Sequence, residues 1–146
     1  MGEFRKLSDT FYASPQVSPQ DISEAAAMGM ALVVNNRPDG EAADQSEGAA
    51  IEAATRAAGM DYLAIPIGSA GFSEPQVERL QDALASAQGP VLGFCRSGTR
   101  STLLWSLAQA RSGGDPDAIA EAAASVGYDV SPVRPAMDMF AARAAE

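Results

Sequence analysis

Short apolar runs alternate with helical patterns along most of the chain. Four runs are each too short for a helix and end at turn residues, which predicts strands over residues 10–13, 30–34, 61–66 and 91–94. Apolar positions at helical spacing predict helices over residues 19–28, 48–58, 74–84, 102–110, 117–126 and 136–145. Because strands and helices alternate, we expect parallel strands joined by right-handed crossovers. The pattern predicts a single three-layer α/β domain over residues 1–146, with a mainly parallel sheet of four to five strands and helices on both faces.

Two helices have strong start signals. Ser18 and Ser73 each precede a first turn that contains proline, and Gln76 completes a capping box with Ser73. Outside the predicted elements, residues 1–6 are expected to be a frayed terminus and residues 128–135 a loop. The last helix is expected either to dock on the domain or to mediate self-association. The sequence does not decide between them, so a homodimer is one of two open expectations.

The single cysteine lies where the strand over residues 91–94 meets the helix that follows it. A loop that enters a helix presents unpaired backbone N–H groups and the positive end of the helix dipole, which together suit an anion. Because a thiolate is an anion, this position favours the nucleophilic form of Cys95. A lone cysteine after an apolar strand is more often an inert buried thiol, but packing does not explain a loop of polar residues, glycine and arginine. The sequence therefore indicates a reactive thiolate.

The residues after Cys95 have the chemistry of an oxyanion site. Gly98 lets the loop curl so that successive N–H groups point inward. Arg100 supplies a planar fork of donors, and Ser101 is expected to donate a hydrogen bond to the sulfur. One loop thus combines a nucleophile, an anion cradle and a counter-charge.

A second loop is expected beside this one. Asn36 and Arg37 follow the strand over residues 30–34, and loops at the carboxyl ends of parallel strands cluster around a ligand crevice. The alternative is a simple turn set by proline and glycine. The predicted catalytic residues are Cys95 and Arg100, and the predicted anion-binding or substrate-binding residues are Arg96, Ser97, Gly98, Thr99, Ser101, Arg37 and Asn36.

Composition narrows the chemistry and the partners. The chain has no histidine, which excludes Cys-His and Ser-His nucleophile pairs and argues against a catalytic transition metal, so neither a metal nor a cofactor is expected. The net charge of −9 argues against nucleic acid or an anionic membrane surface as a partner. A lone cysteine cannot form an internal disulfide, and there is no secretory or membrane-spanning pattern, so a soluble cytoplasmic protein is expected.

The loop over residues 95–101 resembles the active-site loop of rhodanese-type sulfurtransferases, in which four residues separate the cysteine from the arginine. Cysteine-dependent phosphatases have a similar loop with five intervening residues. Residues 35–41 and 62–67 resemble the phosphatase-like domain also found at the N-terminus of beta-lactamase hydrolase-like proteins, whose members are described as sulfurtransferases or phosphatases. The resemblance covers roughly residues 7–128 and implies a cysteine-phosphatase-like fold.

Two observations favour sulfur transfer over phosphoryl transfer. Four residues separate Cys95 from Arg100, so the cradle is expected to suit the terminal sulfur of a persulfide better than a phosphate. The phosphatases that the chain resembles place an aspartate general acid after the strand equivalent to residues 62–66, whereas residues 67–73 contain no acid. The first hypothesis is a sulfurtransferase that moves sulfur from a small anionic donor, such as thiosulfate or a persulfide, to a thiol acceptor through a Cys95 persulfide.

Two alternatives stay open. One is a phosphatase that forms a Cys95 phosphoenzyme, with Glu74 or Asp39 as the general acid, although both carboxylates have simpler explanations as cap and turn residues. The other is a non-catalytic module that binds an oxyanion or senses oxidation at Cys95.

Overall fold

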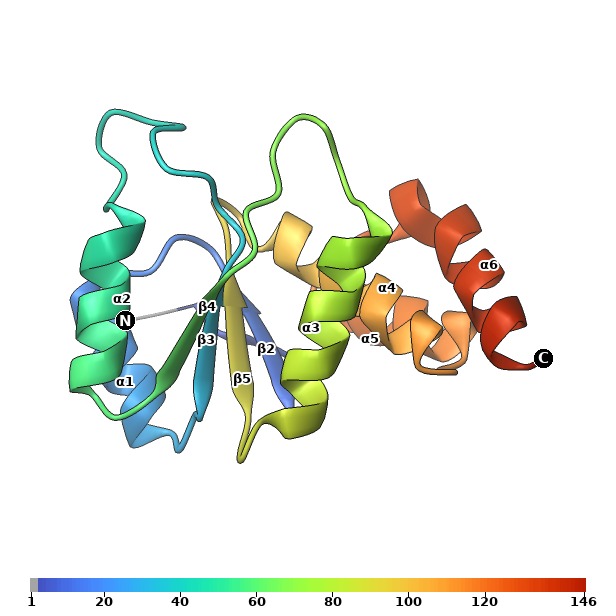
Figure 1. Cartoon of the computed structure of the whole chain (residues 1–146), viewed down its shortest axis with the longest axis horizontal. Helices are drawn as coiled ribbons and strands as arrows, with labels where there is room; N and C mark the ends of the chain where they lie inside the picture. The colour runs from blue at the N-terminus through green and yellow to red at the C-terminus, as the bar shows by residue number, and fades with distance from the viewer. Residues whose placement is uncertain (1–2) are drawn as a thin grey trace.

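A five-stranded sheet lies between layers of helices in the computed structural model, which describes residues 3–146 (Figure 1). The strands are β1 (Arg5–Ser8), β2 (Phe11–Ser14), β3 (Leu32–Asn35), β4 (Asp61–Ala64) and β5 (Val91–Phe94), in the order β1-β2-β5-β3-β4. The helices are α1 (Pro19–Ala27), α2 (Gly48–Ala57), α3 (Glu74–Ser86), α4 (Thr99–Arg111), α5 (Pro116–Ser125) and α6 (Arg134–Ala144), with a short 3₁₀ helix (Ser131–Val133) before α6.

The sheet is mixed but mostly parallel. β2, β5, β3 and β4 run in the same direction, and among the described strands β1 alone is antiparallel, paired with β2. The register places Val91 of β5 between Phe11 of β2 and Leu32 of β3. The predicted three-layer α/β architecture with a mainly parallel sheet is confirmed.

The first strand corrects the expectation of a frayed terminus over residues 1–6. Met1 and Gly2 lie outside the described residues, but the residues of β1 pair with β2 and bury Leu7. A four-residue edge strand gets its backbone hydrogen bonds from its neighbour and has no stability of its own. The hydrophobic pattern of these residues was therefore not enough to predict a strand.

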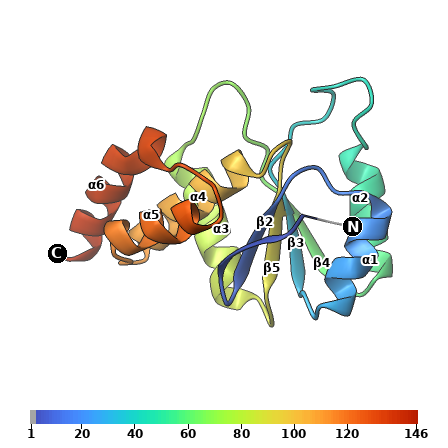
Figure 2. The same cartoon turned by 180° about the vertical axis from the view of Figure 1, so that it is seen from behind.

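The helices divide between the two faces of the sheet. α1 and α2 cover one face, whereas α3, α4, α5 and α6 lie on the other (Figures 1 and 2). Because successive strand residues point to opposite faces, Val33 and Leu92 pack with Ile22 of α1, and Val34 and Val91 join the core on the side of α3 and α4. Burial on both faces explains why the parallel strands read as continuous apolar runs.

The helix after the Cys95 loop is buried on nearly all sides, whereas the pattern predicts one apolar face. Residues 101–108 of α4 are all buried, since α4 contacts the sheet, α3, α5 and α6. Its buried hydroxyls bond along the helix: Thr102 Oγ1 donates to the Gly98 carbonyl at 2.8 Å, and Ser106 Oγ donates to the Thr102 carbonyl at 2.8 Å. The Cys95 loop is therefore joined to a helix that is packed on nearly all sides.

The other element boundaries agree with the sequence predictions to within a few residues. Ser18 caps α1 as predicted and forms a capping box with Asp21 that was not predicted, and Ser73 forms the predicted capping box of α3 with Gln76. α4 begins at Thr99, three residues earlier than predicted, so Arg100 belongs to the first turn of the helix. α6 begins at Arg134, two residues earlier than predicted.

Residues 3–146 include no helix with both the length and the hydropathy needed to cross a bilayer. The same residues hold no group of three or more histidine, cysteine, aspartate or glutamate side chains placed to bind a metal ion. Neither observation tests the expected location or the expected self-association, which stay predictions.

Replacing Gly93 of β5 by alanine is expected to destabilise the fold. A Cβ at this position would lie 2.7 Å from Cζ of Phe11, and the Phe11 ring is itself buried and stacked on Trp105 with centroids 6.0 Å apart. Because the ring is buried and stacked, relieving this contact requires the core to shift, so Gly93→Ala should lower the free energy of unfolding by about 1–3 kcal/mol. Urea denaturation measures this change.

Gly68→Ala is the matched control. A Cβ there would meet only Pro38 Cγ, at an ordinary contact distance of 3.9 Å, so we expect a change of less than about 1 kcal/mol in either direction. Equal effects of the two substitutions would contradict the packing explanation for Gly93.

Candidate active site

The Cys95 loop lies where the chain direction switches across the sheet. β5 and β3 are neighbours, but the chain leaves β5 for α4 on one face and leaves β3 for α2 on the other. Ligands of open α/β sheets bind in the crevice at such a point. Figure 1 shows the loops after β3 and β4 rising from the same edge of the sheet as the end of β5.

Cys95 is buried at the end of β5, and a backbone donor points at its sulfur. The Gly98 N–H donates to Cys95 Sγ at 3.1 Å, which stabilises negative charge on the sulfur. The loop is also tied to the end of β2, because the Cys95 N–H donates to the Ser14 carbonyl at 3.3 Å. The predicted strand, loop and helix arrangement around the cysteine is therefore present.

Gly98 is required by both conformation and space. Its φ of 91° lies in the left-handed region, and a Cβ would overlap the hydroxyl of Tyr128, which donates to the Ser97 carbonyl at 3.1 Å. As the N-cap residue of α4, Gly98 has no side chain to cap the helix. The N–H groups of Arg100 and Ser101 have no acceptor within residues 3–146, so they are available to an anion.

Arg100 is held end-on by a carboxylate. Its Nη1 donates to Glu41 Oε2 at 2.6 Å and to the Ile67 carbonyl at 2.7 Å, and its Nη2 donates to Glu41 Oε1 at 2.9 Å. The hydrogen bond to Glu41 raises the pKa of Arg100, and the nearby Cys95 adds to this effect. Glu41 and Ile67 leave Nε–H and the second Nη2 hydrogen side by side on the other edge of the guanidinium, and the Arg100 side chain also interacts with the side chain of Cys95. Arg100 therefore keeps a fork of two donors for an oxyanion.

Arg37 also binds the Glu41 carboxylate. Its side chain is only 5% exposed, and its Nε donates to Glu41 Oε1 at 3.0 Å. Its Nη1 donates to Gln16 Oε1 at 3.0 Å. Arg37 thus lies next to the Cys95 loop as predicted, but it contacts Arg100 only through the shared carboxylate.

Asn36 and Ser101 join the strand ends to α4. Ser101 Oγ donates to Asn36 Oδ1 at 2.8 Å, and Asn36 Nδ2 donates to the Ile65 carbonyl at 2.9 Å. The expected hydrogen bond from Ser101 to the sulfur is not formed, because the one hydroxyl hydrogen is directed to Asn36. Both residues lie at the site as predicted, but their side chains hold the strand ends and α4 together.

Arg96, Ser97 and Thr99 form the exposed outer part of the loop. Ser97 Oγ donates to Thr99 Oγ1 at 3.0 Å, and the Arg96 carbonyl accepts the Gln16 N–H at 3.3 Å. The Arg96 guanidinium makes no ion pair within the described part of the chain. Arg96 is therefore a cation on the rim.

Three residues at the site were missed by the sequence analysis. Glu41, Gln16 and Tyr128 contact Arg100, Arg37 and the Ser97 carbonyl, respectively. Glu41 had a weak signal, since it follows Arg37 at a spacing of four residues. Gln16 and Tyr128 had none, because their contacts join segments far apart in the sequence.

Neither carboxylate suggested as a general acid is directed at the Cys95 loop. Asp39 Oδ1 accepts the N–H of Gly48, the first residue of α2, at 2.7 Å. Glu74 accepts hydrogen bonds from Arg143 and Arg111, which hold its pKa at about 2. Their positions agree with the simpler roles of turn and helix-end residues.

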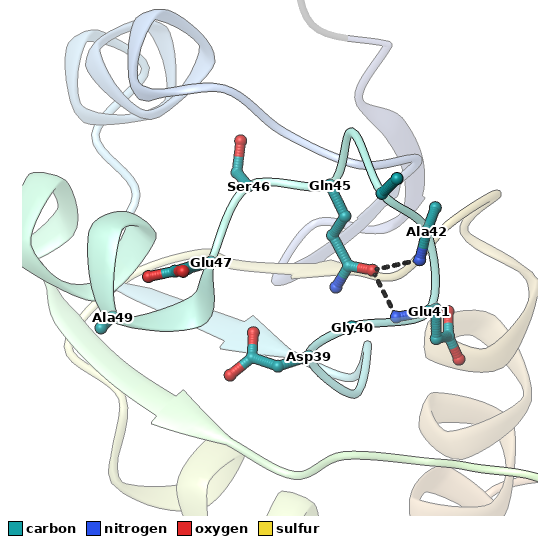
Figure 3. A pocket seen from close by; sticks show the side chains of 9 residues that line it. Asp39, Gly40, Glu41, Ala42, Gln45, Ser46, Glu47 and Ala49 are labelled. Atoms are coloured by element: carbon teal, nitrogen blue, oxygen red, sulfur yellow. Dashed lines mark hydrogen bonds between the residues drawn. The ribbon is translucent and has the colours of Figure 1, made fainter.

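A recess of about 740 Å³ lies beside the site, over the loop between β3 and α2 (Figure 3). Gln45 Oε1 accepts the Glu41 N–H at 3.0 Å and folds this loop back on itself. Figure 3 shows Asp39 and Glu41 pointing away from each other. Neither Cys95 nor Arg100 lines the recess, and its acidic lining does not suit an anion.

Replacing Glu41 by glutamine removes the charge that Arg37 and Arg100 share. Because Arg37 is buried, we expect Glu41→Gln to lower the free energy of unfolding by about 1–3 kcal/mol near neutral pH. Hydrogen bonding by Arg100 lowers the pKa of Glu41 from 4.5 to about 2. A lowered folded-state pKa gives stability that is complete above pH 4.5 and lost as the pH falls toward 2, so the difference between wild type and variant should shrink over that range.

Urea denaturation at a series of pH values measures this difference. Asp44→Asn is the control, because Asp44 is exposed on the same loop and has no ion-pair partner within residues 3–146. A difference that stays constant down to pH 2, or an equal cost for Asp44→Asn, would contradict the assigned role of Glu41.

Known proteins with similar sequences include a beta-lactamase hydrolase-like protein of Agrobacterium fabrum, which is 35% identical over 104 residues. The match covers 71% of this chain and 24% of that protein, so the chain spans about a quarter of the relative's length. A solved structure from Neisseria meningitidis, provisionally described as a phosphatase, has 31% identity and a TM-score of 0.80 over 92% of this chain and 96% of its own. TpbA of P. aeruginosa shares the fold, with a TM-score of 0.67 and 20% identity over 98% of this chain and 91% of TpbA.

These relatives overturn the prediction of a rhodanese-type sulfurtransferase. The relative at 31% identity is described as a phosphatase, so the sulfurtransferase prediction, with its persulfide intermediate and sulfur donor, is wrong. The error came from using the number of residues between Cys95 and Arg100 as a measure of the anion site, although Arg100 lies in the first turn of α4. The cysteine-phosphatase-like fold is confirmed, and with it an enzyme of that fold.

The family model for the phosphatase-like domain of beta-lactamase hydrolase-like protein matches residues 3–112. The matched range contains the sheet, the Cys95 loop and α4, whereas α5 and α6 lie beyond it. The chain belongs to the family of phosphatase-like domains of beta-lactamase hydrolase-like proteins.

Proposed function

We propose that the chain is a cysteine-dependent phosphatase that hydrolyses phosphate monoesters through a Cys95 phosphoenzyme. The observation that carries the proposal is the open pair of donors on Arg100, next to a cysteine whose sulfur already accepts the Gly98 N–H. A tetrahedral oxyanion matches this combination, because a planar fork binds two oxygens while backbone N–H groups bind the others.

The reaction has two steps. Cys95 Sγ attacks phosphorus, and the S–P bond forms as the P–O bond breaks and its electron pair leaves on the oxygen of the leaving group. Water then attacks phosphorus, the S–P bond breaks, and phosphate leaves with the sulfur restored as a thiolate. In both steps the equatorial oxygens carry charge that the Arg100 fork and the N–H groups of the loop and first turn of α4 stabilise.

The short loop is compatible with a phosphate because not all the donors belong to the loop. Arg100 and Ser101 lie in α4, and their N–H groups have no acceptor within residues 3–146. The size of the anion site therefore depends on where α4 begins relative to Cys95, and not only on the number of residues in the loop.

Turnover of p-nitrophenyl phosphate tests the proposal. Cys95→Ser should abolish turnover, and Arg100→Lys should lower kcat/KM by about 10²–10³-fold, because lysine lacks the planar fork that meets the developing charge. Acid quenching of the wild-type protein during turnover should trap one phosphoryl group on Cys95, measured by mass spectrometry of the intact protein.

Arg56→Lys is the matched control, since Arg56 lies exposed on α2 and, among residues 3–146, pairs only with Glu52; its turnover should be unchanged. Full activity of Cys95→Ser would contradict the proposal. Binding of inorganic phosphate without any turnover would instead favour the non-catalytic oxyanion-binding module.

A further inference from the structure

We propose that this site acts on phosphoryl compounds whose leaving group departs without being protonated, such as aryl or acyl phosphates, and not on alkyl phosphate esters. The inference rests on the proposed function and names its substrate class. It comes from the positions of the titratable side chains that contact Arg100 or the Cys95 loop and of the two carboxylates suggested as general acids.

Leaving groups differ in their need for a proton. When the P–O bond breaks, an alkyl ester releases an alkoxide, which needs a general acid to protonate it. A phenol has a pKa of about 10 and a carboxylic acid a pKa of about 4, so their anions leave far more readily. A site without a general acid therefore selects for the second kind of substrate.

The carboxylate nearest to Arg100 cannot supply a proton. Glu41 accepts hydrogen bonds from Arg100 and Arg37 on its two oxygens, and these bonds hold its pKa at about 2. It is ionised at neutral pH, and its oxygens are turned to the end-on edge of Arg100, away from the open fork.

The two other carboxylates considered as acids are committed elsewhere. Asp39 accepts the Gly48 N–H at the start of α2, and Figure 3 shows its side chain pointing away from Glu41. Glu74 lies in an ion-pair cluster with Arg143 and Arg111, which join it to α6 and α4. Both carboxylates are therefore engaged by partners other than Arg100 and the Cys95 loop.

The loop that approaches Arg100 from β4 carries no titratable group. Ile67 supplies its carbonyl to Arg100, and residues 68–73 are glycine, serine, alanine and phenylalanine. The chain also has no histidine. The position at which the resembling phosphatases carry an aspartate is therefore empty of acids in this chain.

Tyr128 is a further titratable side chain that contacts the Cys95 loop. Its hydroxyl donates to the Ser97 carbonyl at 3.1 Å, and burial raises its pKa above 10. Transfer of this proton would leave a half-buried tyrosinate and break the bond that holds the loop, so Tyr128 is a poor acid and a positioning residue.

The test compares kcat/KM across a series of aryl phosphates with phenols of increasing pKa, together with an alkyl phosphate. We expect the rate to fall steeply with the pKa of the leaving group. The alkyl phosphate should be slower than the most activated aryl phosphate by at least the 10²–10⁴-fold, roughly, that a general acid contributes. Asp39→Asn should leave the whole series unchanged.

A shallow dependence on leaving-group pKa would overturn the inference while leaving the proposed function intact. So would a selective loss, in Asp39→Asn or Tyr128→Phe, of activity toward the poor leaving groups alone, because that pattern identifies a general acid. No turnover of even the most activated aryl phosphate would instead overturn the proposed function, and this inference with it.

Discussion

The end-on ion pair between Arg100 and Glu41 is the interaction on which the site depends. A guanidinium presents five donors in one plane, and two contacts along one edge fix that plane in space. Glu41 and the Ile67 carbonyl take three of these donors, so the orientation of the remaining two is set before any ligand arrives. Arg37 in turn fixes the carboxylate, because its side chain is buried and reaches Glu41 and Gln16 together. The loop after β3 thus acts on the loop after β5 through one shared anion.

The packing around α4 makes this geometry rigid. A helix at the edge of a fold could tilt and carry Arg100 with it, but α4 is enclosed by the sheet, α3, α5 and α6. At its first turn, Tyr128 and the end of β2 hold the Cys95 loop from two sides. α5 and α6 lie beyond the residues that the family model matches, yet α6 packs against α4, and Tyr128 lies in the segment between α5 and α6. Roughly the last quarter of the chain therefore packs against the helix that carries Arg100 and against the Cys95 loop.

Local signals in the sequence predicted most of the fold and the centre of the site. The capping serines, the apolar strands and the cysteine between strand and helix are all short-range patterns, and the structure agrees with them. What the sequence did not reveal depends on long-range contacts: β1 exists because β2 pairs with it, and Glu41 meets Arg100 across 59 positions. The reaction type was misjudged for a similar reason. Counting the residues between Cys95 and Arg100 treats the loop as a closed ring of fixed size. The positions of its hydrogen-bond donors depend instead on the left-handed turn at Gly98, because that turn starts α4 earlier than the apolar periodicity indicates.

The positive charges of Arg37 and Arg100 are partly balanced by Glu41. The Arg37, Glu41 and Arg100 group carries one net positive charge, and a Cys95 thiolate would cancel it. The chain as a whole has a net charge of −9, so a phosphate dianion gains little from long-range attraction and is repelled at a distance. Donors fixed in direction, the Arg100 fork and the backbone N–H groups, must therefore supply most of the stabilisation, and they are most effective when charge has moved onto the equatorial oxygens. For the proposed phosphatase, this implies weak binding of the ground state and better binding of the transition state, which is the difference in binding that accelerates a reaction.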